Sequence, residues 1–123
     1  MKIIEAINRN DALNHNTYNQ EDKVQWLSRV DWLVKKHIID THEGAEEVSF
    51  SGYDDLTDTQ KELLVPEPYD ELYLRWMEAQ IHYHNGEYDK YNNAIEMFNT
   101  LWTEFQNYYN RTHMPKGKKF QYF

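Results

Sequence analysis

The sequence contains no cysteine and has only four glycines and three prolines among its 123 residues. Without cysteine the chain has no disulfide framework, no thiol nucleophile and no thiolate ligand for a metal, which is compatible with a reducing cytoplasm. The glycine patterns that hold phosphates, GxxxxGK[ST] and GxGxxG, are missing, as is the GxSxG motif of hydrolases. These absences argue against an enzyme, and we expect no catalytic residue, no cofactor and no metal.

Long apolar runs are missing as well. No stretch approaches the ~18 uninterrupted apolar residues of a membrane-spanning helix. The opening residues, MKIIE, lack the apolar run of a signal peptide. We therefore expect a soluble, unexported protein that has no membrane partner.

A broad excess of positive charge is also absent, because the net charge is −8. This argues against a body that wraps duplex DNA, which requires a cationic surface to displace counterions. The charge is unevenly distributed, since residues 43–78 carry −9 and residues 111–123 carry +4. Such an asymmetry suggests electrostatic contacts with partners. A solvated acidic loop with a frayed basic end is the alternative interpretation.

Aromatic residues, in contrast, are abundant: the chain has four Trp, ten Tyr and five Phe. A chain this rich in large rings is not typical of intrinsic disorder. Each ring can bury ~150 to 250 Å², so a few of them can build a core. The length suits one domain, and we expect a single folded domain over residues 1–123.

Apolar residues spaced three and four apart predict helices over residues 20–41, 69–85 and 88–111. Asn19 is a suitable N-cap for the first of these helices, and Gly86 suits the end of the second. Because so short a turn separates the last two helices, they should fold back as an antiparallel hairpin. The last helix carries the most regular apolar ladder, which we expect to lie in the core: Tyr88, Tyr91, Ile95, Phe98, Trp102, Phe105 and Tyr109.

Upstream of these helices, residues 1–19 predict a short helix that ends near Asn10 and a polar connector. The predicted fold class is therefore all-α. We expect a small antiparallel helical bundle with a long loop between the second and third helices and an extended C-terminal tail.

The predicted loop, residues 42–68, loses the helical periodicity and is unusually long for a compact domain, which is typical of functional or disordered loops. Within it, residues 48–53 alternate like a strand without an obvious partner in the chain. A β-ribbon completed by a neighbouring subunit is one interpretation. We expect the loop to be mobile in the monomer and ordered by a partner.

The predicted tail, residues 112–123, follows the last helix, and Pro115 and Gly117 prevent the helix from continuing into it. The tail combines lysines with aromatic rings, so we interpret it as an assembly arm that is steered by charge and anchored by rings. A disordered end whose lysines only aid solubility is the alternative. The candidate partner-binding residues of loop and tail are Phe50, Tyr53, Asp54, Asp55, Lys116, Lys118, Lys119, Phe120, Tyr122 and Phe123.

No metal site is predicted. His82 and His84 lie two apart, so their side chains diverge by about 200° on a helix and cannot hold one ion from the same face. His37 and His42 are five residues apart and lie on either side of a predicted helix end, so they do not have the spacing of a helical metal site. The acidic run of the loop lacks the glycine turn and distal Glu of a calcium loop. The four Trp residues could form a stacking platform, but we favour core packing because all four lie on or beside apolar stripes: Trp26, Trp32, Trp76 and Trp102.

Four parts of the sequence resemble one family. They are residues 6–18, which precede a helix carrying Trp26 and Leu27, ELLVPEPYDELY at 62–73, EAQI at 78–81 with NGEYDKYNN at 85–93, and NYYNRTHMP at 107–115. The chain resembles the small head-tail connector proteins, also called adaptor or head-completion proteins, of tailed bacteriophages and Gram-positive prophages. The similarity covers most of the chain and is weakest in the loop at 44–60 and after Pro115.

This resemblance implies an all-helical adaptor that forms a ring, twelve-fold in the virion, beneath the portal protein. There it would extend the DNA channel and offer a platform to the next connector or tail protein. DNA would pass through without sequence-specific binding, and the protein would move from the host cytoplasm to the virion neck. The alternative is a small cytoplasmic helical interaction or regulatory domain without a virion role.

Overall fold

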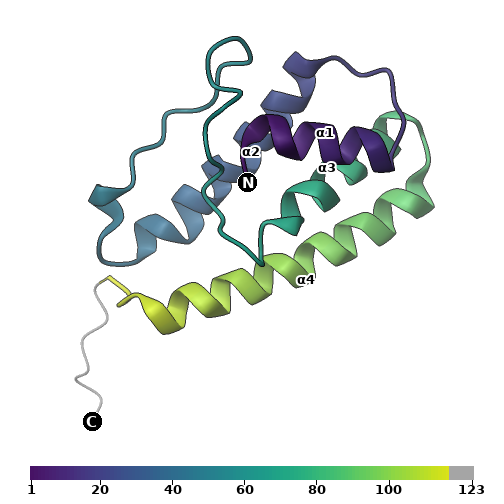
Figure 1. Cartoon of the computed structure of the whole chain (residues 1–123). Coiled ribbons are helices and arrows are strands. Elements are labelled where there is room, and N and C mark those ends of the chain that lie inside the picture. The colour runs from purple at the N-terminus through teal and green to yellow at the C-terminus, as the bar shows by residue number, and fades with distance from the viewer. Residues whose placement is uncertain (117–123) are drawn as a thin grey trace.

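The computed structural model describes residues 1–116. This part of the chain contains helices and no β-strand, so the predicted all-α class is confirmed. Figure 1 shows α4 along one side of the molecule, with α3 beside it and α1 and α2 across them. The elements are α1 (Ile3–Leu13), α2 (Gln20–His37), the short 3-10 helices η1 (Ile39–Thr41) and η2 (Ala45–Glu47), α3 (Glu71–His84) and α4 (Tyr88–Thr112).

Helix α2 begins where the sequence predicts. The Asn19 side chain accepts a hydrogen bond of 2.8 Å from the Asp22 amide and so caps the helix. Its end differs from the prediction, because α2 stops at His37 and a separate 3-10 turn covers the last residues of the expected helix. Side chains compete for the carbonyl of Ile38: the Thr41 hydroxyl donates to it at 2.7 Å, and a ring nitrogen of His42 lies 2.6 Å away.

Helices α3 and α4 form the predicted antiparallel hairpin (Figure 1). Asn85 closes α3 through its amide, which donates to the Ile81 carbonyl at 3.0 Å. Gly86 follows with φ of 78°, a left-handed conformation that favours glycine, and α4 begins two residues later at Tyr88. No helix in the described part of the chain is long and apolar enough to cross a membrane.

The hydrophobic core lies between α1, α2 and α3, and α4 packs against α3. Trp102, expected in this core, is only partly buried, and Tyr88 is 60% exposed. Helix α3 has 14 residues and α4 has 25, so the end of α4 extends past α3, and Phe105 is buried there against Tyr69, which precedes α3. The fully buried large side chains include Ile3, Val24, Leu27, Val30, Val34, Leu72, Tyr73, Met77, Ile81 and Phe105.

The long loop is anchored by its own domain. Leu63 and Val65 are buried in the core, and the Leu63 amide donates to the Met1 carbonyl at 2.9 Å. Helix α1 is held to the same stretch, because the Ile3 amide donates to the Lys61 carbonyl at 3.0 Å. The far end of the loop is thus anchored within its own domain, while its mobility in the monomer and its ordering by a partner stay predictions.

Candidate interaction surface

A buried carboxylate joins the loop to two helices. Asp31 on α2 is fully buried, and both of its oxygens accept hydrogen bonds. The Tyr53 hydroxyl from the loop and the Tyr73 hydroxyl from α3 donate to opposite oxygens, the latter at 2.5 Å. The Leu64 amide donates to the carboxylate at 3.1 Å, and the Val65 amide donates to the Tyr73 hydroxyl at 2.8 Å. This network holds the two arms of the loop against α2.

The environment of Asp31 alters its titration. Burial raises the pKa of Asp31 from 3.8 to about 6, and the hydrogen bonds from both tyrosines and from Leu64 oppose that rise. The carboxyl group does not reach solvent, and its oxygens are already occupied by donors from the chain. Its role is therefore to position the loop, not to act on a substrate.

The raised pKa predicts how stability changes with pH. Folded Asp31 binds its proton more tightly than unfolded Asp31, so its contribution to the free energy of unfolding is complete below the unfolded pKa and is lost as pH rises through about 6. When the pH is lowered from about 7 to about 4, the free energy of unfolding of the native chain should rise by about 2 kcal/mol more than that of Asp31→Asn. Urea unfolding at both pH values measures this, and equal pH dependence of the two proteins would contradict it.

Beside this network lies a groove of about 390 Å³ between two segments of the loop. Phe50 is half-buried there, and its ring packs edge-on against Trp32 at 4.9 Å and Tyr53 at 4.8 Å between centroids. Gly52 has φ of 95°, and a Cβ added to it would lie 3.5 Å from the Trp32 indole nitrogen. The groove is lined by Ser49, Phe50, Ser51, Gly52, Tyr53, Lys61, Glu62 and Leu64.

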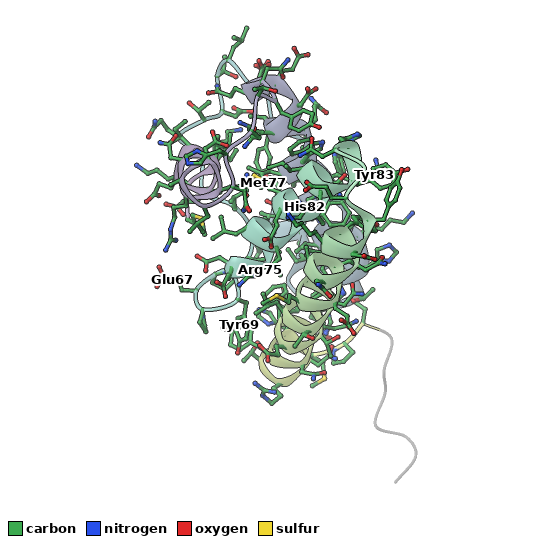
Figure 2. All side chains as sticks on the ribbon, turned by 90° about the vertical axis from the view of Figure 1, so that its right-hand side faces the viewer. Glu67, Tyr69, Arg75, Met77, His82 and Tyr83 are labelled. Carbon is green, nitrogen blue, oxygen red and sulfur yellow. The ribbon has the colours of Figure 1, made fainter. Side chains whose placement is uncertain are left out.

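Half-exposed aromatic residues continue from this groove across α2 to the α3–α4 hairpin. Trp32 is 48% exposed and Tyr83 is 51% exposed, while Trp26 stacks on His84 with centroids 6.0 Å apart. Arg29 lies between two open grooves and has no ion-pair partner among residues 1–116. Figure 2 shows Tyr83 at the surface and Met77 directed inward. We call this surface the aromatic strip: Trp26, Arg29, Trp32, Tyr83 and Tyr91.

The aromatic strip has the composition of a protein interface. Trp, Tyr and Arg are the residues that most often dominate binding energy, because each combines a large contact area with a polar group. The preference for core packing is wrong for Trp32, which leaves about half of its side chain in solvent. Its helical phase was the available signal, since Trp32 lies off the buried stripe that contains Val30 and Val34.

The acidic turn of the loop uses its carboxylates internally. Asp58 accepts a hydrogen bond of 2.7 Å from the Asp54 amide, and Asp54 accepts one of 2.7 Å from the Leu56 amide. The bond from the Asp54 amide lowers the pKa of Asp58. Within residues 1–116 no group of three or more His, Asp or Glu side chains could hold a metal. Asp54 is exposed, and Asp55 is partly exposed beside Trp32.

The histidines noted in the sequence have structural surroundings. His42 is buried, and its Nε2 lies 2.7 Å from the Asn110 side-chain oxygen of α4. His84 stacks on Trp26, whereas His82 lies beside Glu87 at 3.2 Å. The predicted divergence of His82 and His84 is thus confirmed.

The structure separates the candidate partner-binding residues. Phe50, Asp54 and Asp55 reach the surface near Trp32. Tyr53 does not: it is 8% exposed and its hydroxyl is held by Asp31, so its assignment as a partner contact is wrong. Its sequence context resembles that of Phe50, and only the buried acceptor distinguishes the two.

The start of the tail is attached to the body. The Lys116 side chain is exposed, while its amide donates to the Thr41 carbonyl at 2.8 Å. Next to it, Pro115 forms an isolated bridge with His42. The remaining tail candidates lie outside the described residues: Lys118, Lys119, Phe120, Tyr122 and Phe123.

Sequence reasoning missed Arg29, Tyr83 and the buried Asp31. For Asp31 a signal existed, because an acidic residue stands one turn from Leu27 and from Val34 on the apolar face of α2. A comparison of the chain with protein-family models, curated proteins and solved structures finds no match.

Proposed function

We propose that the chain is a structural assembly protein, an adaptor subunit of a ring that joins the portal of a tailed phage to the next connector or tail protein. The observation that carries the proposal is the similarity of residues 62–73, 85–93 and 107–115 to small head-tail connectors. These stretches are the approach to α3, the turn between α3 and α4, and the end of α4. They therefore frame the hairpin that dominates the fold.

The surface of the domain supports an assembly role. A ring subunit needs two different faces, because a head-to-tail contact closes a ring by repeating one rotation. The aromatic strip offers one face that is rich in contact residues, and the basic tail leaves from the end of α4 beside Thr41. The acidic middle segment, which carries −9, suits a channel that DNA passes without adhering.

The second candidate is a small cytoplasmic interaction or regulatory domain without a virion role. The aromatic strip favours it equally, because a strip of Trp, Tyr and Arg fits many protein partners. The two proposals differ in one partner, the portal. The portal protein encoded in the same gene cluster should therefore be purified with the chain and imaged by electron microscopy. A ring of adaptor density beneath the portal supports the first proposal, and purified components that do not associate contradict it.

A charge reversal tests the contribution of the aromatic strip. Arg29→Glu should weaken self-association or portal binding at least about tenfold, or ~1.4 kcal/mol, because Arg29 stands between both grooves of the strip. Arg9→Glu is the matched control, since Arg9 is also exposed but lies on α1 and lines neither groove. Sedimentation velocity gives the affinities, and circular dichroism should show unchanged helicity. Equal affinities for both variants would exclude the strip as an interface.

A further inference from the structure

We propose that the loop segment Val48–Ser51 is a docking edge for the C-terminal segment, residues 117–123, of a neighbouring copy, which adds to it as a β-strand. The inference rests on the proposed ring and identifies one contact between its subunits. It is carried by the backbone of the loop, the groove beside it, and the composition of the C-terminal segment.

The backbone of this segment is free to pair. Among residues 1–116 the amides and carbonyls of residues 49–52 take part in no hydrogen bond. The run is bounded by the Val48 amide, which donates to the Ala45 carbonyl at 3.1 Å, and by the Tyr53 amide, which donates to the Ser28 hydroxyl at 3.2 Å. Consecutive unpaired backbone groups form an edge to which an extended peptide can add.

The side chains of the segment alternate as those of an edge strand do. Val48 and Phe50 are half-buried against the core, whereas Ser49 and Ser51 are exposed. Val48 itself has extended backbone angles, with φ of −109° and ψ of 108°. A period of two in burial is the pattern of a strand with one face on the core.

The edge is held in position by one contact within it and one just after it. Phe50 packs edge-on against Trp32, and Tyr53 is tied to Asp31. The groove of about 390 Å³ is lined by three residues of this segment and also by Lys61 and Glu62. An added strand would therefore meet a fixed edge and find space for its alternate side chains, as peptide addition to a sheet edge requires.

The C-terminal segment has the composition of such a strand. Its sequence is GKKFQYF, in which Phe120 and Tyr122 alternate with Lys119, Gln121 and Phe123. Phe and Tyr favour extended structure. Seven extended residues span at most about 25 Å, which exceeds the ~13 Å of a four-residue edge.

Charge favours the same pairing. The tail from Lys116 carries +3, which leaves −11 on the rest of the chain, and the segment 43–78, which includes the edge, carries −9. Opposite charges on two copies steer the segment of one toward the loop of the next. Because tail and loop are different surfaces, the contact is heterologous, and its repetition closes a ring where the rotation permits.

The test combines amide hydrogen exchange with peptide competition on the full chain. Exchange at residues 49–51 should slow at least about tenfold as chain concentration rises through the range in which sedimentation velocity shows self-association. A synthetic GKKFQYF peptide should dissociate the self-associated chain, whereas a scrambled peptide of the same composition should not.

Two modified peptides distinguish strand addition from side-chain docking. Neighbouring residues of a strand direct their amides to opposite sides, so only one of the Phe120 and Gln121 amides can bond to the docking edge. N-methylation of that amide must block strand pairing, whereas N-methylation of the other should be tolerated. We expect one of these peptides to compete like the unmodified one and the other at least about tenfold more weakly. Equal competition by both would overturn strand addition, and protection that does not depend on concentration would overturn docking to a neighbouring copy.

The experiments can contradict the docking edge and the adaptor role independently of each other. Rings that form on the portal without protection of residues 49–51 would overturn this docking edge and leave the adaptor role standing. Concentration-dependent protection in a chain that never binds a portal would leave the docking edge standing and contradict the adaptor role.

Discussion

Asp31→Ala should lower the free energy of unfolding by about 3 to 5 kcal/mol, because it leaves several buried donors without an acceptor. The hydroxyls of Tyr53 and Tyr73 and the amide of Leu64 all donate to the Asp31 carboxylate. Each unsatisfied donor costs about 1 to 3 kcal/mol, and relaxation of the loop recovers part of that cost. The loop should loosen first, since Tyr53 and Leu64 are held to α2 through Asp31.

Urea denaturation followed by circular dichroism measures the loss. Glu21→Ala is the control, because Glu21 is an exposed acid on the same helix, and its replacement should change stability by no more than about 0.5 kcal/mol. Limited proteolysis should cut the Asp31→Ala chain between residues 49 and 60 before the native chain. A loss similar to that of the control would show that the network contributes little to stability.

Phe105→Ala should cost about 3 to 5 kcal/mol, the largest loss expected on α4. Phe105 is 1% exposed, and its ring lies among those of Tyr69, Tyr108 and Tyr109, with centroids 5.9, 6.3 and 5.8 Å away. Removal of the ring leaves a cavity that the surrounding residues can close only in part.

Trp102→Ala provides the comparison. Trp102 lies one turn earlier on the same ladder and is larger, yet it is only partly buried, so its loss should be smaller than that of Phe105. Equilibrium unfolding of both variants gives the order. If Trp102→Ala were the more destabilising change, the packing of α4 against the loop and α3 would differ from that described.

Local chemistry made most of the helical framework predictable. The Asn19 side chain caps α2 from a position next to the helix, and Gly86 supplies the left-handed residue between α3 and α4. Apolar spacing located the helices for the same reason, since positions three and four apart share a face whatever the helix packs against. The end of α2 was less predictable, because Thr41 and His42 compete there for the carbonyl of Ile38.

The candidate site was predictable only in part. Phe50, Asp54 and Asp55 do reach the surface near Trp32, as their place in a polar loop suggested. Tyr53 belongs to the same stretch but is buried. Its hydroxyl donates to Asp31 of α2, which also accepts a hydrogen bond from the Tyr73 hydroxyl of α3. Such a pairing joins residues that are far apart in sequence, so no local pattern reveals it.

By itself the sequence determined the all-helical class, the caps and turns of the helices, and the uneven distribution of charge, because these depend on residues near one another or on simple composition. The tertiary structure alone decided which apolar residues of each helix are buried by a neighbouring element. Helix α3 has 14 residues and α4 has 25, so the end of α4 extends past α3; there the Tyr69 ring from the loop packs against Phe105, whereas Trp102 stays partly exposed. Burial depends on what the neighbouring element supplies: the loop covers only one side of Trp32, and Arg29 stays exposed.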